Sequence, residues 1–157
     1  MNAAAVVESR FLPDEQATLE LGGKLAAAMV PGLYIALSGD LGSGKTTLAR
    51  GILRGLGYQG RVKSPTYTLV ELYKVSRLDL YHFDFYRFED PGEFLEAGFQ
   101  ECFDGHNVCL VEWPERVQGL LPQADLDIGI SIEDDGRRIS ISADTELGKH
   151  CLARLTD

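Results

Sequence analysis

The sequence predicts an α/β fold, and three features of its 157 residues support that prediction. Two short, continuous apolar runs, Leu33 to Leu37 and Val108 to Val111, are typical of strands buried on both faces, as in parallel sheets. Ahead of the first run, apolar residues recur from Leu21 at i+4, i+7 and i+8, the spacing of an amphipathic helix. The composition, 45% hydrophobic and 25% charged, is that of an ordinary globular protein. We therefore expect residues 1–157 to form a single domain.

The first half of the chain is expected to run helix, strand, loop, helix. Pro13-Asp14-Glu15 puts acidic residues in a first helical turn, where the helix dipole favours them, and Pro31-Gly32 ends that helix. The strand at 33–37 leads into a glycine-rich loop, Gly39 to Gly44. A second helix follows at Thr46 to Leu56.

The second half contains more strand than helix. Tyr67 to Val75 and Leu78 to Tyr86 are rich in β-forming residues and are expected to pair as a hairpin, because few residues separate them. Alternating isoleucines on both sides of Asp134-Asp135-Gly136 predict a second hairpin with one face in water. The other expected elements are a helix that begins at Asp90-Pro91, a strand at Val108 to Val111 and a terminal helix at Glu146 to Leu155.

Charge and cysteine content restrict the environment and the partners. The net charge of −9 disfavours unaided binding to nucleic acid. Basic residues are concentrated between Lys45 and Arg77. They would suit the binding of a polyanionic ligand or an anionic partner, or they form a solvated helix face. Three cysteines without metal-like spacing, Cys102, Cys109 and Cys151, indicate reduced thiols. We find no apolar stretch long enough for a membrane span and no export signal at Met1 to Arg10, so we expect a cytoplasmic protein without membrane contact.

The glycine-rich loop carries the strongest functional motif. Gly39-Asp-Leu-Gly-Ser-Gly-Lys-Thr46 matches the phosphate-binding pattern G-x-x-x-x-G-K-[ST], and it follows a buried strand and opens a helix, as the pattern requires. Its glycines let backbone N–H groups approach phosphate oxygens, and the helix N-terminus favours the same anion. We expect Lys45 to hold the β- and γ-phosphates and the Thr46 hydroxyl to bind Mg²⁺.

A phosphate loop usually works with an acidic residue at the end of a neighbouring strand, and two candidates are present. Glu112 follows the apolar run 108–111, and Asp84 lies in the aromatic strand on the same face as His82 and Tyr86. We assign Glu112 to the metal, directly or through water. Asp84 is assigned to the γ-phosphate region, where it would hold a metal-bound or attacking water. The reverse assignment and a solvated strand end for either acid stay open.

Four further side chains each have two possible roles. Thr66 is either part of a switch that senses the γ-phosphate or a turn residue beside Pro65. Arg87 suits a transferring phosphoryl group or a surface salt bridge, and Trp113 suits stacking on a base or a partner, or simple packing. His82 has no spaced metal-ligating partner, so we expect it to be structural.

No Asn or Thr is followed by Lys, so the guanine-reading segment [NT]-K-x-D is absent and adenine is the expected base.

Five segments of this sequence together resemble the bacterial TsaE (YjeE) family, whose members are small ATPases that take part in threonylcarbamoyladenosine modification of tRNA. The phosphate loop alone is generic. Ser64-Pro-Thr-Tyr-Thr-Leu69, His82-Phe-Asp-Phe-Tyr-Arg87 and Val111-Glu-Trp-Pro-Glu115 in one short chain are specific to this family. With Leu12-Pro-Asp-Glu-Gln-Ala-Thr18, the resemblance extends over nearly the whole chain.

The resemblance implies a three-layer α/β P-loop NTPase fold, with a parallel core sheet extended by antiparallel strands, and ATP and Mg²⁺ as ligands. The positions that match the family's magnesium residues are Thr46 and Glu112. The expected catalytic residues are Lys45, Asp84 and Thr66, the last in the family's switch-like loop. The residues expected to bind the nucleotide are Glu15, Gly42, Ser43, Gly44, Lys45, Thr46, Thr47 and Asp84.

The resemblance also implies partners. The family works with TsaB and TsaD, which transfer the threonylcarbamoyl group to adenosine 37 of tRNA. Weak ATP hydrolysis, raised by these partners, would reset or license their cycle, and tRNA would be reached indirectly through the complex. Three alternatives remain: a small-molecule kinase, although lid arginines are not apparent; a GTPase-type switch, although the guanine segment is absent; and a structural adaptor with an inactive loop.

Overall fold

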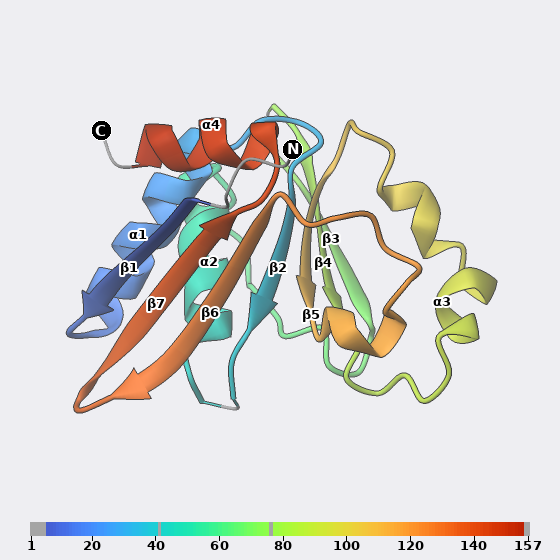
Figure 1. Cartoon of the computed structure of the whole chain (residues 1–157), viewed down its shortest axis with the longest axis horizontal. Helices are drawn as coiled ribbons and strands as arrows, with labels where there is room; N and C mark the ends of the chain where they lie inside the picture. The colour runs from blue at the N-terminus through green and yellow to red at the C-terminus, as the bar shows by residue number, and fades with distance from the viewer. Residues whose placement is uncertain (1–5, 41, 76, 156–157) are drawn as a thin grey trace.

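The computed structural model describes residues 6–40, 42–75 and 77–155, which build one seven-stranded sheet with the strand order β1-β7-β6-β2-β5-β4-β3 (Figure 1). The segment Met1 to Arg10, in which we expect no export signal, lies in part outside these residues, and Leu41 of the loop motif lies outside them. The strands are β1 (Val6–Leu12), β2 (Tyr34–Ser38), β3 (Val70–Lys74), β4 (Asp79–Asp84), β5 (Val108–Glu112), β6 (Leu126–Glu133) and β7 (Gly136–Ala143). The helices are α1 (Glu15–Ala28), α2 (Lys45–Gly55), α3 (Gly92–Glu96) and α4 (Glu146–Leu155), with 3₁₀ turns at Phe99–Cys102 and Pro114–Val117.

The centre of the sheet is parallel and its two sides are antiparallel, as predicted. β2 runs parallel to both β5 and β6, and β4 runs parallel to β5. The pairs β3–β4, β6–β7 and β1–β7 are antiparallel. The apolar runs of β2 and β5 are buried on both faces because helices or turns cover the central strands on each side.

Two hydrophobic clusters on opposite faces of the sheet complete three layers. On one face, Ile35, Leu110 and Ile128 belong to a cluster shared with α1, α2 and α4. On the other face, Phe83 and Val111 belong to an aromatic cluster that includes residues of α3 and of the two 3₁₀ turns. Figure 1 shows α1, α2 and α4 on one side of the sheet and α3 beyond β5 on the other. Along β6 and β7, buried residues alternate with more exposed ones, so the hairpin with one face in water is confirmed.

Several boundaries differ from the prediction, and one strand was missed. β1 (Val6–Leu12) was not predicted, because its partner β7 is more than a hundred residues away in sequence. The strand expected from Tyr67 begins only at Val70, since the Leu69 N–H donates to the Pro65 carbonyl at 2.8 Å and closes a turn. The strand expected to reach Tyr86 ends at Asp84, and the helix at Asp90-Pro91 is reduced to Gly92–Glu96. The three cysteines are free, as expected, and no helix among the described residues is long and apolar enough to cross a membrane.

Candidate functional site

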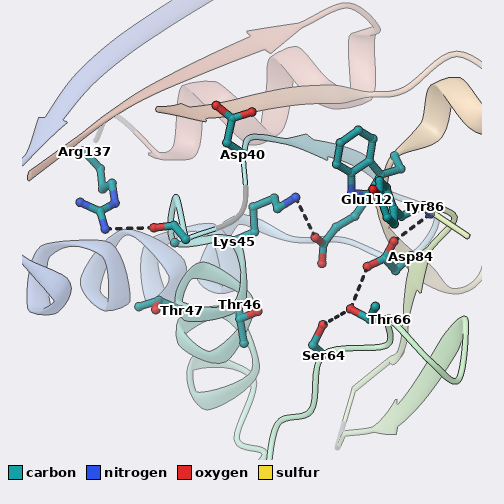
Figure 2. Close-up of a pocket in the computed structure, with 13 residues that line it drawn as sticks. Asp40, Lys45, Thr46, Thr47, Ser64, Thr66, Asp84, Tyr86, Glu112 and Arg137 are labelled. Atoms are coloured by element: carbon teal, nitrogen blue, oxygen red, sulfur yellow. Dashed lines mark hydrogen bonds and ion pairs between the residues drawn. The ribbon is translucent and has the colours of Figure 1, made fainter. Parts of the chain in front are cut away.

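A cavity of about 710 Å³ lies at the carboxyl ends of the parallel strands β2, β5 and β4, where the phosphate loop turns into α2. This is the edge of a parallel sheet at which α/β proteins bind ligands, and the volume is within the range of small-molecule sites. Figure 2 shows its side chains converging from the loop, from the β4 and β5 ends and from the β7 hairpin. Its lining includes Asp40, Gly42, Gly44, Lys45, Thr46, Thr47, Ser64, Thr66, Asp84, Tyr86, Glu112, Trp113 and Arg137.

The phosphate loop has the backbone geometry that its glycines allow. Gly44 caps α2 with φ +111°, in the left-handed region that disfavours side chains. Gly39 has φ +154°, and a Cβ there would lie 2.6 Å from both the Ile130 carbonyl oxygen and the Ser43 hydroxyl. The first turn of α2 therefore directs its free N–H groups and the positive end of its dipole towards the cavity.

Lys45 and Glu112 form a buried ion pair in the cavity. Lys45 Nζ lies 3.3 Å from Glu112 Oε1, and His82 Nε2 lies 2.7 Å from Glu112 Oε2. Glu112 is only 4% exposed and His82 is fully buried, so the solvated alternative for Glu112 is wrong and the structural expectation for His82 is confirmed. Burial by itself would raise the pKa of Glu112, but the hydrogen bond with His82 and the charge of Lys45 outweigh it and hold the pKa below its ordinary value.

Asp84 lies beside Glu112, and the loop carrying Thr66 contacts it. The two acids are register partners on the parallel strands β4 and β5. Asp84 Oδ1 accepts the Tyr86 N–H at 2.9 Å, and Oδ2 accepts the Thr66 hydroxyl at 3.3 Å. Thr66 is also 2.8 Å from the Ser64 hydroxyl. Burial raises the pKa of Asp84, the charge of Glu112 adds to that effect, and the hydrogen bonds and Lys45 offset it only in part.

These oxygens suit a magnesium ion. The Thr46 hydroxyl and the carboxylates of Asp84 and Glu112 line one cavity, and hydroxyl and carboxylate oxygens are the ligands that Mg²⁺ prefers. Two adjacent buried carboxylates, one with a raised pKa, would be relieved by a cation. Among the described residues no group of three or more His, Cys, Asp or Glu side chains could hold a metal. Mg²⁺ does not need one, because it keeps waters and binds phosphate oxygens as well.

A smaller cavity of about 180 Å³ adjoins the loop on the side of α1. Glu15, Thr18, Gly44 and Thr47 are among its lining residues. The segment before α1 therefore lies beside the phosphate loop. Glu15 also pairs with Arg50 at 3.5 Å.

Of the remaining aromatic and basic candidates, Trp113 lines the cavity, whereas Arg87 is not among its lining residues. Trp113 packs against the aromatic cluster and lies 4.9 Å from Tyr86 between ring centroids, and its stacking on a base or partner stays a prediction. Lys45 Nζ lies 5.1 Å from the centroid of the Trp113 ring. Arg87 is stacked 5.3 Å above the ring of Tyr67. Tyr67, one residue from Thr66, is 83% exposed.

Sequence reasoning missed Arg137. From the β7 hairpin, its guanidinium reaches the phosphate loop, as Figure 2 shows, and it borders both cavities. One feature of the sequence could have indicated that Arg137 points inward. Strand alternation places it on the same face as Ile139 and Ile141, which are buried.

The phosphate loop, the parallel core and the three layers together define a protein of the P-loop NTPase fold. A crystal structure of Bacillus subtilis YdiB is similar to the chain with a TM-score of 0.83 and 33% identity, covering 98% of this chain and 97% of that one. The sequence model of the family described as "Threonylcarbamoyl adenosine biosynthesis protein TsaE" matches residues 12–139. This chain belongs to the TsaE family.

Curated relatives agree with this assignment over most of their length. The Haemophilus influenzae protein named tRNA threonylcarbamoyladenosine biosynthesis protein TsaE is 44% identical over 95% of this chain and 98% of its own. The Bacillus subtilis protein of the same name is 47% identical over 76% of both chains. The Treponema pallidum protein is 39% identical over 78% of this chain and 90% of its own.

Proposed function

We propose that this chain binds and hydrolyses ATP with Mg²⁺ and serves the synthesis of threonylcarbamoyladenosine on tRNA. The observation that carries the ATPase activity is the convergence of Lys45, Asp84 and Glu112 on one cavity at the N-terminus of α2. Membership of the TsaE family, whose curated relatives are named for threonylcarbamoyladenosine biosynthesis, supports the pathway.

Five polar residues of the cavity have roles that their positions support. Lys45 would exchange its contact with Glu112 for the β- and γ-phosphates, beside the N–H groups of the loop. Thr46 and Glu112 would hold Mg²⁺, which neutralises charge on the phosphates when bound. Asp84 would orient the attacking water; the bond from the γ-phosphorus to the bridging oxygen breaks, and ADP and phosphate leave. Thr66, which contacts Asp84, would make its loop sensitive to the γ-phosphate.

The proposal includes TsaB and TsaD as partners that raise a weak intrinsic hydrolysis. The exposed Tyr67 ring lies in the same turn as Thr66, so a protein that covers Tyr67 could change the position of Thr66 and, through it, of Asp84. Transfer RNA would be reached through that complex, in keeping with the net charge of −9.

The test compares Lys45→Ala with Lys24→Ala. Lys45 is 8% exposed in the cavity, whereas Lys24 is an exposed residue of α1, so the two variants remove the same charge from different places. Phosphate release from ATP and Mg²⁺ is measured with and without TsaB and TsaD, and tRNA modification is measured in the reconstituted system. Competition between GTP and ATP for binding shows which of the two bases the chain prefers.

We expect the unmodified chain and Lys24→Ala to release phosphate slowly alone and faster with the partners. Lys45→Ala should retain its fold, measured by circular dichroism, and lose both phosphate release and support for modification. Full modification by folded Lys45→Ala would refute the ATP-dependent role. Equal rates with and without the partners would refute stimulation.

A further inference from the structure

We propose that Arg137, in the C-terminal hairpin, is a positioning residue that holds the phosphate loop in the shape that binds a polyphosphate. The inference rests on the proposed nucleotide binding by this loop and adds to it a part of the chain that carries no recognisable motif. Arg137 lies more than ninety residues beyond the loop in sequence, so that only the fold brings the two together.

Each nitrogen of the Arg137 guanidinium donates to a backbone carbonyl oxygen. Nε donates to the Ser43 carbonyl oxygen at 2.8 Å, and Nη2 donates to the Gly42 carbonyl oxygen at 3.1 Å. Nη1 donates to the Gly136 carbonyl oxygen at 2.8 Å, within the hairpin. Two successive loop carbonyls are thus tied to one rigid, planar group, and the third bond anchors that group to its own strand.

The bond to the Ser43 carbonyl also orients one amide of the loop. A trans peptide group is planar, and its N–H points away from its C=O. When Arg137 holds the Ser43 carbonyl, the N–H of Gly44 in the same peptide group must point to the opposite side. Gly44 lines the larger cavity, so Arg137 presents this amide where a phosphate oxygen would accept it.

The hairpin is a firm support for this contact. Arg137 is paired with Leu12 of β1 on one side and with Ile132 of β6 on the other. Its side chain leaves the strand on the face of the buried Ile139 and Ile141, which belong to the cluster shared with α2. A lysine in the same position could not replace it fully, since an ammonium group lacks the planar fork that spans two carbonyls.

Arg138 provides a matched control in the next position. It carries the same charge but points to the other face of the sheet. Its guanidinium pairs with Glu133 through Nε at 2.7 Å and Nη2 at 3.2 Å and lies 5.6 Å from the centroid of the Phe11 ring. A substitution at Arg138 therefore perturbs the same hairpin without touching the loop.

The experiment measures binding of ADP and of AMP, each with Mg²⁺, by calorimetry to the whole chain and to Arg137→Gln, Arg137→Lys and Arg138→Gln. We expect Arg137→Gln to weaken ADP binding about tenfold, equivalent to about 1.4 kcal/mol, and Arg137→Lys to weaken it less. AMP lacks the β-phosphate that the loop holds, so its affinity should change less than about twofold. Arg138→Gln should match the unmodified chain for both ligands.

A second readout needs no nucleotide. Hydrogen exchange of the amides at residues 42–46 should be faster in Arg137→Gln than in Arg138→Gln, because the loop carbonyls lose their common anchor. If Arg137→Gln proves unfolded, Arg137→Lys is compared with Arg138→Lys in the same assays, and a selective loss of ADP affinity in the former is still expected.

Two results would overturn the inference. The first is that folded Arg137→Gln binds ADP as tightly as the unmodified chain does. In the lysine comparison, the equivalent result is that both Arg137→Lys and Arg138→Lys bind ADP as tightly as the unmodified chain. The other is an equal loss for ADP and AMP, which would mean that Arg137 supports the hairpin or the base rather than the loop. Absence of ADP and ATP binding by the unmodified chain would instead contradict the proposed function, so the two failures are distinguished.

Discussion

Replacing Gly22 with alanine should leave the protein less stable than the same change at its neighbour Gly23, which should stabilise it. Both residues lie in the middle of α1, so both substitutions bring the same gain in helix propensity. They differ in what the new methyl group meets. A Cβ at Gly22 would lie 2.7 Å from the Gly51 carbonyl carbon and from the Ile52 nitrogen, both in the backbone of α2. A Cβ at Gly23 would have no atom within 4 Å.

The size of the effect follows from these distances. Carbon atoms pack best at about 3.5–4.0 Å, so α1 and α2 must separate by roughly 0.8 Å or more to accommodate the methyl group at Gly22. Forcing extra carbon into a packed contact typically costs about 1–3 kcal/mol. The propensity gain of alanine over glycine is about 1 kcal/mol in each variant. Gly23→Ala should therefore be about 1 kcal/mol more stable than the unmodified chain, and Gly22→Ala about 1–3 kcal/mol less stable than Gly23→Ala.

Urea denaturation, monitored by circular dichroism, measures this difference directly. Thermal denaturation provides a second measure, since each kcal/mol shifts Tm by roughly 2–4 °C in a chain of this size. The comparison between Gly22→Ala and Gly23→Ala cancels the propensity term. If Gly22→Ala is as stable as Gly23→Ala, the close approach of α1 to α2 does not constrain residue 22, contrary to this prediction.

Two further predictions concern buried or paired acids. His82→Leu should cost about 1–3 kcal/mol in the free energy of unfolding, because the buried Glu112 carboxylate loses its 2.7 Å partner; unchanged urea denaturation would contradict this. Asp127 is exposed on β6, but partial desolvation, together with the hydrogen bond and charge of Asp144, raises its pKa from 3.8 to about 6. The folded state thus holds this proton more tightly than the unfolded state, and stability is lost as pH rises from 3.8 through 6. Asp127→Asn should therefore raise Tm above pH 6 and leave it unchanged below pH 3.8, and an equal gain at both ends of a pH series would exclude the Asp127–Asp144 pair as its cause.

The elements that could be predicted from the sequence are those whose signals are local. The helix from Glu15 ends before Pro31-Gly32, and the helix after the phosphate loop extends to Gly55, because caps, glycines and apolar periodicity lie within each segment. The buried strands were predicted for the same reason, since a continuous apolar run needs no partner to be recognised. The motif of the phosphate loop is contiguous, so Lys45 and Thr46 could be named directly.

Some of the remaining features depend on contacts between distant segments. β1 exists because β7 offers it an edge, and its own seven residues carry little pattern. The turn at Pro65 to Leu69 interrupts a run of β-forming residues, and the ordered contact from Thr66 to Asp84 accompanies it. For β1 the backbone hydrogen bonds that decide the outcome are made with a strand that local propensity does not include, whereas the turn is closed within its own segment by the Leu69 N–H and the Pro65 carbonyl.

The sequence by itself predicted phosphate-binding chemistry, through a loop whose glycines, lysine and threonine must be adjacent to surround a phosphate chain. Only the tertiary structure decided how that loop is surrounded. It placed Asp84 beside Glu112, supplied His82 to Glu112 and brought Arg137 to the loop carbonyls. The physical reason is that a phosphate loop is built from consecutive backbone groups, whereas buried carboxylates and a guanidinium acquire partners only when strands from separate parts of the chain pair.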